Sequence, residues 1–516
     1  MGIKNYKIYT PSEYAELMIN LSLKNYFNND YSKEKLEKLK ITDLSCGTGN
    51  LLLVALKRLI EISKEITGKY YFKSSWLTGY DIDRNALLEY KLQGQNILRK
   101  YGLTGEIIAY IKDSIVDDID EKYSIILGNP PYLGEKNHKD VFNKVKETEF
   151  GKKYYEGRMD YFYFFIEKGI DLLEKFGVLT YVTTNYWLKA DSAMILRNKL
   201  RKDGNFLNII DYNTSIFERA TGQHNMIFSW RKDYDIFRKE DVNIDVTREN
   251  KTFHMNNINV YDENFLISLL DEKERIFNEK IKKKTNAKLK DIFNINQGIV
   301  SGCDKVFVTR EYDEEFKKYL KPFYKSKDVM KYYNNQENKF WIYYITKDVK
   351  IDKKLYNKLL EHIEILEKRR EVKNRSINWW ELTWPRNKEI FIGKKILVRQ
   401  RCKTNYFSYD NGSFFGSADI YYLTPKNDGV SVLYFLGYLN SKIFCEWYRL
   451  NGKHKGYNLE FYVTPLKEVP IYIPNNLDEE LRDIRDIEEL VKEQIENYSD
   501  ENQKKIDDYF TKLYNF

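Results

Sequence analysis

Short apolar runs and helical hydrophobic patterns alternate along the first half of the chain. The apolar runs end near residues 44, 80, 111, 128, 183, 211 and 230. Between them lie segments with apolar residues three and four positions apart, including residues 159–175 and 189–202. Strands that alternate with helices are typical of a mainly parallel sheet with helices on both faces. We therefore predict an α/β fold for residues 1–235.

The pattern changes after this region. Residues 236–290 are highly charged and have helical spacing near residues 265–284, so we expect a helical connector. Residues 291–475 contain short strands and turns, which predicts a mixed α+β domain. Residues 476–516 form a C-terminal helical segment, and we expect its apolar face to pack within the protein. There is no internal repeat.

The most informative motif is Asn129-Pro130-Pro131-Tyr132, which follows the apolar run at residues 123–128. An aromatic amino group is a poor nucleophile, because its lone pair is delocalised into the ring. The side-chain carbonyl of Asn129 and the backbone carbonyl of Pro130 are suited to accept both of its N–H bonds. The prolines stiffen the loop, and the Tyr132 ring offers a surface for base stacking. Taken alone, a proline-rich turn after a core strand explains the motif equally well.

Three earlier strand ends provide the context. The first strand runs into Cys46-Gly47-Thr48-Gly49, where glycines let the backbone approach a ligand closely. The third glycine of a dinucleotide-binding motif is missing. Asp81 follows the second strand and suits a ribose diol, and Asp113 follows the third and suits an adenine amino group. Each aspartate alone is more often a helix cap, but four strand ends in this order favour a nucleotide site.

These motifs resemble the gamma class of DNA adenine-N6 methyltransferases, the TaqI-like type with a catalytic domain before a target-recognition domain. The similarity extends to Ile8-Tyr9-Thr10-Pro11 and to residues 215–228, 292–302 and 414–419. It implies a Rossmann-like S-adenosylmethionine-binding catalytic domain at residues 1–235 and a DNA target-recognition domain at residues 291–475. It also implies a role in restriction-modification or in a related defence or epigenetic system.

The resemblance further implies roles for individual residues. The residues implied to orient and stack a flipped adenine are Asn129, Pro130, Pro131, Tyr132 and Phe217. The residues implied to bind S-adenosylmethionine are Tyr9, Thr10, Pro11, Asp43, Ser45, Gly47, Asp81, Ile82, Asp113, Ser114, Asn129 and Pro131. One departure concerns Asp43, which is followed by Leu44-Ser45 where the family often has proline and glycine.

Charge adds candidate DNA contacts. The formal net charge of +8 is modest for a polyanion-binding protein, and lysine runs alone also fit solvated helix faces. Three loops mix basic residues with amide and aromatic ones, a composition that suits contacts to phosphates and base edges. The DNA contacts predicted in these loops are Arg386, Arg399, Arg401, Lys403, Asn405, Lys453, His454 and Lys455. We expect double-stranded DNA as the partner.

Cysteine and histidine usage argues against other classes. The four cysteines are scattered without a close pair and only five histidines are present, so we expect neither a zinc site nor a disulfide framework. No apolar run is long enough for a membrane span and no export signal precedes residue 9. We therefore expect a cytoplasmic monomer without metal, working beside a separate restriction endonuclease rather than carrying a fused nuclease.

Two other functions remain open at this point. RNA and protein-glutamine methyltransferases also use an Asn-Pro-Pro-Tyr loop, because a side-chain amide presents the same chemical problem. They rarely need some 280 residues beyond the catalytic domain. A DNA-binding subunit with an inactive methyltransferase lobe is the second alternative, and the presence of Asp81, Asp113 and Asn129 argues against it.

Overall fold

The computed structural model describes residues 10–218, 222–233, 242–335, 337, 340–455, 457–474 and 478–516. Its contacts fall into two compact units, unit 1 at Met1–Glu272 and unit 2 at Lys273–Phe516. Tyr9, one of the predicted cofactor contacts, lies outside the described residues.

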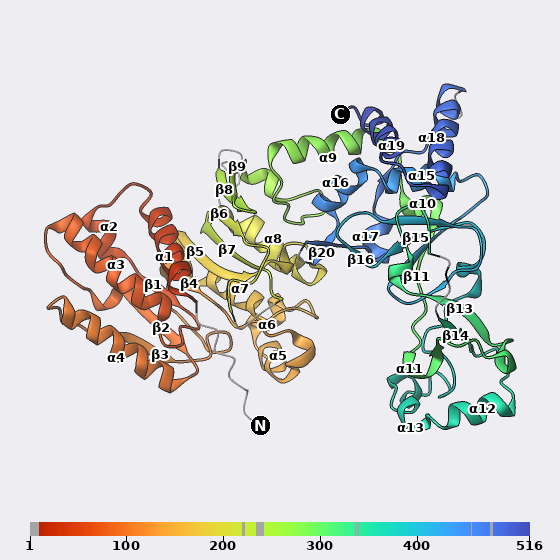
Figure 1. The fold of residues 1–516 in the computed structure, drawn as a ribbon. Helices are drawn as coiled ribbons and strands as arrows, with labels where there is room; N and C mark the ends of the chain where they lie inside the picture. Colours follow the sequence, from red (N-terminus) through yellow and green to blue (C-terminus); the bar gives the residue numbers. More distant parts are fainter. Residues whose placement is uncertain are drawn as a thin grey trace. The chain divides into compact units, whose positions relative to one another are not determined.

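Unit 1 is built around one large sheet, in which nine strands pair among the described residues (Figure 1). The strand order is β3-β2-β1-β4-β5-β7-β6-β8-β9. The strands are β1 Ile41–Asp43, β2 Leu77–Asp81, β3 Ile108–Ile111, β4 Tyr123–Gly128, β5 Leu173–Thr184, β6 Gly204–Asp211, β7 Asn225–Lys232, β8 Asn243–Arg248 and β9 Lys251–Asn256. Strands β3 to β5 run parallel, while β7 is antiparallel to both β5 and β6. The α/β fold with a mainly parallel sheet is confirmed.

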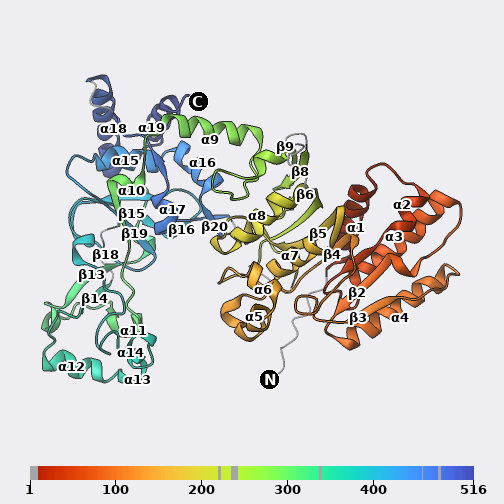
Figure 2. The same cartoon turned by 180° about the vertical axis from the view of Figure 1, so that it is seen from behind.

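Helices cover both faces of this sheet (Figure 2). The helices are α1 Ser12–Phe27, α2 Lys33–Lys38, α3 Asn50–Thr67, α4 Arg84–Lys100, α5 Lys139–Lys146, α6 Glu149–Tyr154, α7 Phe162–Leu172 and α8 Met194–Asp203. Apolar side chains of α1, α3 and α4 form one buried cluster with the sheet, and those of α5 to α8 form another. The sheet is therefore the middle layer of a three-layer unit.

The turn between β1 and α3 depends on glycine. Gly49 has φ 83°, a left-handed conformation that other residues adopt at a cost. A Cβ built at this position would come within 2.1 Å of the Tyr90 ring. Glycine is therefore required here both by the backbone and by the close packing of α4 against the turn.

The predicted connector at residues 236–290 is not a separate element. Strands β8 and β9 extend the sheet of unit 1, with β8 parallel to β6 and β9 antiparallel to β8. The helix α9 begins only at Glu272 and ends at Lys284. The catalytic fold thus extends beyond the predicted boundary at residue 235. Charged residues in β8 and β9 hid them, because an edge hairpin buries only one face.

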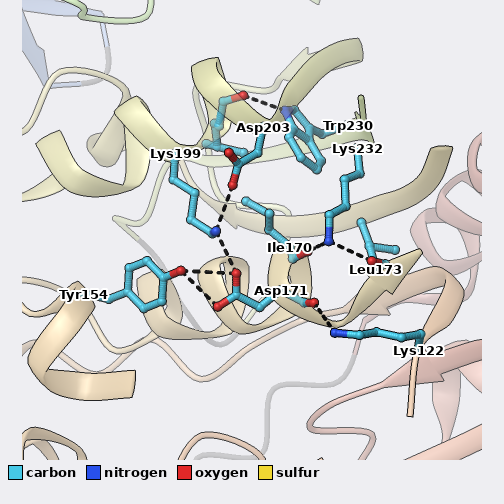
Figure 3. Close-up of polar contacts among 10 residues, drawn as sticks. Lys122, Tyr154, Ile170, Asp171, Leu173, Lys199, Asp203, Trp230 and Lys232 are labelled. Carbon is cyan, nitrogen blue, oxygen red and sulfur yellow. Dashed lines mark hydrogen bonds and ion pairs between the residues drawn. The ribbon is translucent and has the colours of Figure 1, made fainter. Parts of the chain in front are cut away.

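Two lysines hold the end of α7 in place (Figure 3). Lys232, on β7, is 7% exposed and donates to the carbonyls of Ile170 at 2.7 Å and Leu173 at 2.8 Å. Lys122 is exposed and donates to the carbonyl of Asp171 at 2.8 Å. The last carbonyls of a helix have no partner within the helix, so these ammonium groups satisfy them and favour the negative end of the helix dipole.

We expect Lys232→Met to destabilise unit 1 by about 2 kcal/mol, because it leaves two buried carbonyls without a donor. Hydrogen exchange of the α7 and β5 amides, read by mass spectrometry, measures this loss. Lys122→Met is the control, and its exposed hydrogen bond is expected to contribute about 0.5 kcal/mol or less. Equal protection in both variants would show that the buried ammonium adds nothing to stability.

Unit 2 contains several small sheets. Their orders are β11-β19-β15-β17, β12-β14-β13-β18, β16-β21-β20 and β10-β22. The strands are β10 Ala287–Lys288, β11 Phe293–Gln297, β12 Val308–Thr309, β13 Leu320–Tyr324, β14 Trp341–Tyr343, β15 Lys395–Arg399, β16 Arg401–Cys402, β17 Phe407–Asp410, β18 Phe415–Gly416, β19 Ile420–Pro425, β20 Lys453–Lys455, β21 Asn458–Glu460 and β22 Pro470–Ile471. The predicted mixed α+β character is confirmed.

Unit 2 begins with α9, and the longest helices after it are at the C-terminal end. The helices after α9 are α10 Leu289–Ile292, α11 Asp304–Phe307, α12 Lys353–Leu360, α13 Ile363–Leu366, α14 Arg370–Lys373, α15 Val432–Leu439, α16 Lys442–Asn451, α17 Val463–Lys467, α18 Asp478–Glu496 and α19 Asp500–Leu513. Ile487 and Val491 of α18 are buried against α15 in the main core of the unit. The C-terminal helices therefore pack within the protein, as expected. Among the described residues, every helix is too short or too polar to cross a membrane.

Candidate active site and nucleic-acid interface

The four predicted strand ends meet at one edge of the sheet of unit 1. Strands β3, β2, β1 and β4 are neighbours in that order and run parallel. Asp43 lies opposite Leu127 of β4, so the loop that starts at Asn129 leaves the sheet beside it. The topology thereby brings Asp43, Asp81, Asp113 and Asn129 to the carboxyl edge, where open α/β sheets bind ligands.

Asp81 organises the turn after β1. Its Oδ2 accepts a hydrogen bond from the Gly47 amide at 2.8 Å, and its Oδ1 accepts one from the Asp83 amide at 2.8 Å. Gly47 has φ 54°, and a Cβ added to it would meet nothing within 4 Å. The turn is thus fixed by Asp81 and leaves open space beside Gly47. A carboxylate has about four acceptor positions, so Asp81 can still accept from a ligand.

Asp43 is buried at the end of β1. Its side chain is 3% exposed, and its Oδ1 accepts a hydrogen bond from the Ser45 amide at 2.9 Å. Burial, and to a smaller extent the charge of Asp81, raises the pKa of Asp43 to about 7, although the Ser45 amide opposes the shift. Burial thus disfavours the ionised form of Asp43. A positively charged group bound beside it would offset this cost and favour the ionised carboxylate.

The third strand end is tied to the first. Asp113 accepts hydrogen bonds from the amides of Ile115 at 3.2 Å and Val116 at 3.4 Å, which closes the turn after β3. Ser114 is buried, and its hydroxyl donates to the carbonyl of Leu44 at 2.7 Å. The Ser114 hydroxyl is thus committed to the protein as a donor, which leaves only its acceptor capacity for a ligand.

The remaining groups at this edge fit a nucleoside with a cationic amino-acid tail. Ile82 is 67% exposed beside Asp81, so an apolar surface is available for a flat ring. Thr10 is buried and Pro11 precedes the first turn of α1. Two carboxylates, an open glycine turn and an exposed aliphatic side chain are the chemistry that such a ligand requires.

The loop after β4 is held by its tyrosine. Asn129 is half-buried and Pro130 is buried. The Tyr132 hydroxyl donates to the carbonyl of Val182 in β5 at 3.1 Å, and its ring packs edge-on against Phe162 with centroids 5.7 Å apart. The loop is therefore anchored on the neighbouring strand and on α7.

Phe217 faces the same loop from the opposite side. Its ring centroid lies 6.5 Å from that of Tyr132, with the two planes inclined by 54°. A base held between two rings needs about 7 Å, since each face contact takes about 3.5 Å. Phe217 is only 3% exposed, so its ring must turn before a base can enter.

Asp160 is a site residue that the sequence did not single out. It accepts a hydrogen bond from the amide of Leu133 at 3.0 Å, and the Tyr161 amide donates to the carbonyl of Leu133 at 2.9 Å. Burial raises the pKa of Asp160 to about 6, although the amides of Phe162, Leu133 and Tyr161 oppose the shift. Asp160 thus fastens the segment that follows Tyr132 to the start of α7.

Two predicted DNA-contact loops meet in unit 2. Strand β16 pairs with β21, and β21 pairs with β20, so Arg401 and Lys453 lie on either side of Glu460. Arg401 donates to Glu460 at 2.6 Å and its side chain is 49% exposed. The Lys453 ammonium lies 4.6 Å from the centre of the Tyr462 ring. Residues about fifty positions apart in the chain thus form one basic sheet.

The other predicted DNA-contact residues differ in how exposed their side chains are. Lys403 is exposed and His454 is half-buried. The side chain of Lys455 lies outside the described residues. Arg386 donates to the Gly298 carbonyl at 3.2 Å and to the Gln297 side chain at 2.9 Å. Arg386 thus uses part of its guanidinium to hold a loop of unit 2.

Arg399 and Asn405 also hold the protein together. Arg399 donates to the carbonyls of Val329 at 2.5 Å and Lys327 at 3.2 Å. Asn405 is 3% exposed, and its Nδ2 donates to the carbonyls of Leu439 at 2.8 Å and Ser441 at 2.9 Å. The prediction that Asn405 reads DNA is wrong, because both of its N–H bonds are used inside unit 2.

Within the described residues no group of three histidine, cysteine, aspartate or glutamate side chains is arranged to hold a metal ion. The chemistry at the carboxyl edge is that of carboxylates, an amide and aromatic rings. Unit 1 is thus a Rossmann-like α/β fold with a polar carboxyl edge, and a mixed α+β unit follows it.

Comparison with known proteins identifies the family. Residues 13–217 match the Eco57I restriction-modification methylase family, and residues 321–471 match the TaqI-like C-terminal specificity domain. The type II methyltransferase M.HindII of Haemophilus influenzae is 28% identical over 451 residues, which is 78% of this chain and 86% of that protein. The type II methyltransferase M.MjaIV of Methanocaldococcus jannaschii is 31% identical over 267 residues, which is 48% of this chain and 86% of that protein.

A solved structure has the same fold across the whole chain. The type IIL restriction-modification enzyme MmeI, determined in complex with DNA, superposes with a TM-score of 0.68 and 14% identity. The match covers 100% of this chain and 77% of that one. The chain belongs to the type II DNA methyltransferases, with an Eco57I-type methylase domain followed by a TaqI-like specificity domain, and its methyl donor is S-adenosylmethionine.

Proposed function

We propose that this chain transfers a methyl group to N6 of an adenine that is flipped out of double-stranded DNA. The observation that carries the proposal is the position of the loop at residues 129–132. It leaves the sheet next to β1, beside the carboxylates suited to the cofactor, and it bears an amide and an aromatic ring. The family suggests that this methylation is specific for a DNA sequence and that it serves restriction-modification or a related system.

The chain's own residues have defined tasks in this reaction. S-adenosylmethionine supplies an electrophilic methyl group. The Asn129 side-chain carbonyl and the Pro130 backbone carbonyl accept the two N–H bonds of the adenine amino group, which leaves its nitrogen directed at the methyl. Positioning of this kind can account for a large part of the acceleration. The new N–C bond would form as the methyl–sulfur bond breaks and leaves a neutral thioether, and the surplus proton would then pass to water, because the methylated nitrogen is strongly acidic.

The two aromatic rings offset the cost of extruding the base. Removing an adenine from the duplex costs a few kcal/mol. Stacking contributes about 1 to 3 kcal/mol per base. We assign this stacking to Tyr132 and Phe217, and we call the space between their rings the base slot. In unit 2, the exposed side chains of Arg401, Lys403 and Lys453 are proposed to contact phosphates, where they set affinity rather than sequence preference.

Asp43 gives a testable pH dependence. We propose that its carboxylate pairs with the amino group of the bound cofactor. The pKa of Asp43 is about 7 in the folded protein, so the carboxyl is largely neutral at pH 6 and ionised at pH 8. We therefore expect affinity for S-adenosylmethionine to rise about tenfold from pH 6 to pH 8, measured by isothermal titration calorimetry.

The contribution of Asp43 to folding stability has the opposite pH dependence to its contribution to cofactor affinity. Because the folded pKa of Asp43 is raised above its unfolded value, the group favours folding below about pH 4 and this contribution is lost as the pH rises through 7. Asp43→Asn is the control, because it removes the titration while keeping a carbonyl for the Ser45 amide. A pH profile that is equally steep in this variant would exclude Asp43 as its source.

Side-by-side methyl transfer identifies the acceptor. The full chain is incubated with radiolabelled S-adenosylmethionine and with duplex DNA, RNA or a glutamine-containing protein. We expect label in DNA alone, recovered as N6-methyladenine in nucleoside mass spectrometry. Label in RNA or protein, or as a cytosine product, would contradict the proposal. Absence of cofactor binding would indicate an inactive methyltransferase lobe. Long-read sequencing of DNA from expressing cells would then give the modified motif.

A further inference from the structure

Asn225 lies at the first position of β7, behind the loop that carries Phe217. Its side chain is fully buried. Its backbone amide donates to the Thr214 carbonyl at 3.0 Å, and its backbone carbonyl accepts from the Tyr212 amide at 3.1 Å. Its side-chain Oδ1 accepts from the Ile216 amide at 3.2 Å. One residue thus makes three of the hydrogen bonds that shape the segment leading to Phe217.

The other end of the same side chain is its amide nitrogen, Nδ2. The Asn225 Nδ2 is buried and has no hydrogen-bond partner among the described residues. A buried amide without a partner is costly, so this group is expected to have a use. Burial and the Asp160 carboxylate raise the pKa of the Tyr132 phenol, whereas the Asn225 side chain lowers it.

The Tyr132 hydroxyl is able to accept a hydrogen bond from this Nδ2. It donates its hydrogen to the Val182 carbonyl at 3.1 Å, which leaves the lone pairs of the phenol oxygen to accept. Val182 lies on β5, and β5 and β7 are paired so that Thr184 lies opposite Asn225. The strand pairing therefore fixes the Asn225 amide relative to the anchor of Tyr132.

We propose that Asn225 is a positioning residue that couples the two walls of the base slot. Its Oδ1 holds the Phe217 loop, and its Nδ2 donates to the Tyr132 hydroxyl when a base occupies the slot. This inference rests on the proposed function, because it assumes that a base enters between the two rings. It predicts that Phe217 cannot be displaced independently of Tyr132.

Asn205 is a matched control in the same unit. It lies on β6, is 1% exposed, and its Oδ1 accepts from Asn257 at 2.7 Å. Its Nδ2 is also buried and has no partner among the described residues. Asn205 and Asn225 therefore share residue type, burial and a buried Nδ2 without a partner among the described residues, but the Asn205 Oδ1 accepts from Asn257 rather than from the segment leading to Phe217.

The experiment compares Asn225→Ala, Asn225→Asp and Asn205→Ala. Single-turnover methyl transfer, S-adenosylmethionine affinity and the fluorescence of 2-aminopurine at the target position are measured for each. For Asn225→Ala we expect transfer about 10- to 100-fold slower, because misplaced stacking disturbs the approach geometry. The affinity for S-adenosylmethionine should stay within about twofold of wild type, while the 2-aminopurine signal falls.

Asn225→Asp separates the two halves of the inference. Its carboxylate keeps an acceptor for the Ile216 amide but lacks the donor for Tyr132, so transfer should recover in part relative to Asn225→Ala. Cofactor binding shows that each variant is folded, and Asn225→Asp answers the question if the alanine variant does not fold. Wild-type transfer rates in both Asn225 variants, or an equal loss in Asn205→Ala, would overturn the inference. Lack of N6-methyladenine with the unchanged chain would instead contradict the proposed function.

Discussion

Asn129→Ala is expected to lower the rate of methyl transfer by about 100- to 1000-fold while leaving S-adenosylmethionine binding unchanged. The side-chain carbonyl of Asn129 is proposed to hold one N–H bond of the target amino group. Loss of one such preorganised hydrogen bond costs an enzyme about 3 to 4 kcal/mol. The cofactor retains its proposed contacts with Asp43 and Asp81, so its affinity should change by less than about twofold.

Single-turnover transfer from radiolabelled cofactor to duplex DNA measures the first effect, and titration calorimetry measures the second. Asn137→Ala is the matched control, since Asn137 is exposed in the same connection between β4 and α5. This variant should be as active as wild type. Retention of full activity by Asn129→Ala would remove Asn129 from the mechanism.

Asp81→Ala is expected to have the opposite profile, with cofactor binding lost first. The carboxylate accepts hydrogen bonds from the amides of Gly47 and Asp83, so its removal frees the turn after β1 as well as removing the proposed partner of the ribose. Charge-assisted hydrogen bonds contribute about 1.5 to 3 kcal/mol each. We therefore expect S-adenosylmethionine affinity to fall by about 100-fold or more.

Asp83→Ala controls for the loss of a carboxylate in the same loop. Asp83 accepts hydrogen bonds from the amides of Asn85 and Ala86 and caps α4. Its removal should cost about 1 kcal/mol of stability, while cofactor affinity should stay within about threefold of wild type. Similar losses of affinity in both variants would indicate a general disturbance of the loop rather than a role for Asp81.

The two variants also separate the two halves of the site. Asn129→Ala should bind the cofactor and fail in transfer, whereas Asp81→Ala should fail at binding and recover some transfer at high cofactor concentration. A single defect shared by both would mean that the loop at residues 129–132 and the turn at residues 43–49 do not act as distinct parts.

Some features of the fold were predictable because they depend on local sequence. The apolar run at residues 123–128 is the strand β4, and the glycine turn at residues 46–49 joins β1 to α3. Parallel strands place their ends at one edge, so their order alone brought Asp43, Asp81 and Asn129 together. The edge strands β8 and β9 were missed, because their charged residues mask a one-sided apolar pattern.

Individual polar side chains were harder to assign. Arg369 belongs to a basic cluster in the sequence, yet it is 9% exposed and donates to the carbonyls of Glu381 at 2.8 Å and Trp379 at 2.6 Å. Asn405 likewise spends both N–H bonds on α15 and the start of α16. Asn405 sits in a segment whose composition suggests DNA contact, whereas the basic cluster around Arg369 also fits a solvated helix face. The partners of Asn405 lie more than thirty positions away in the chain, so composition could not reveal them.

By itself, the sequence determined the alternation of strands and helices, the polar residue at each strand end and the loop at residues 129–132, while the class came from the resemblance of these motifs to a known family. These follow from hydrophobic period and turn chemistry, which act over a few neighbouring residues. Only the tertiary structure decided which polar groups remain exposed and which hold the protein together. Asn225 is buried at the start of β7, where its Oδ1 accepts from the Ile216 amide, and β7 pairs with β5 across more than forty positions of the chain.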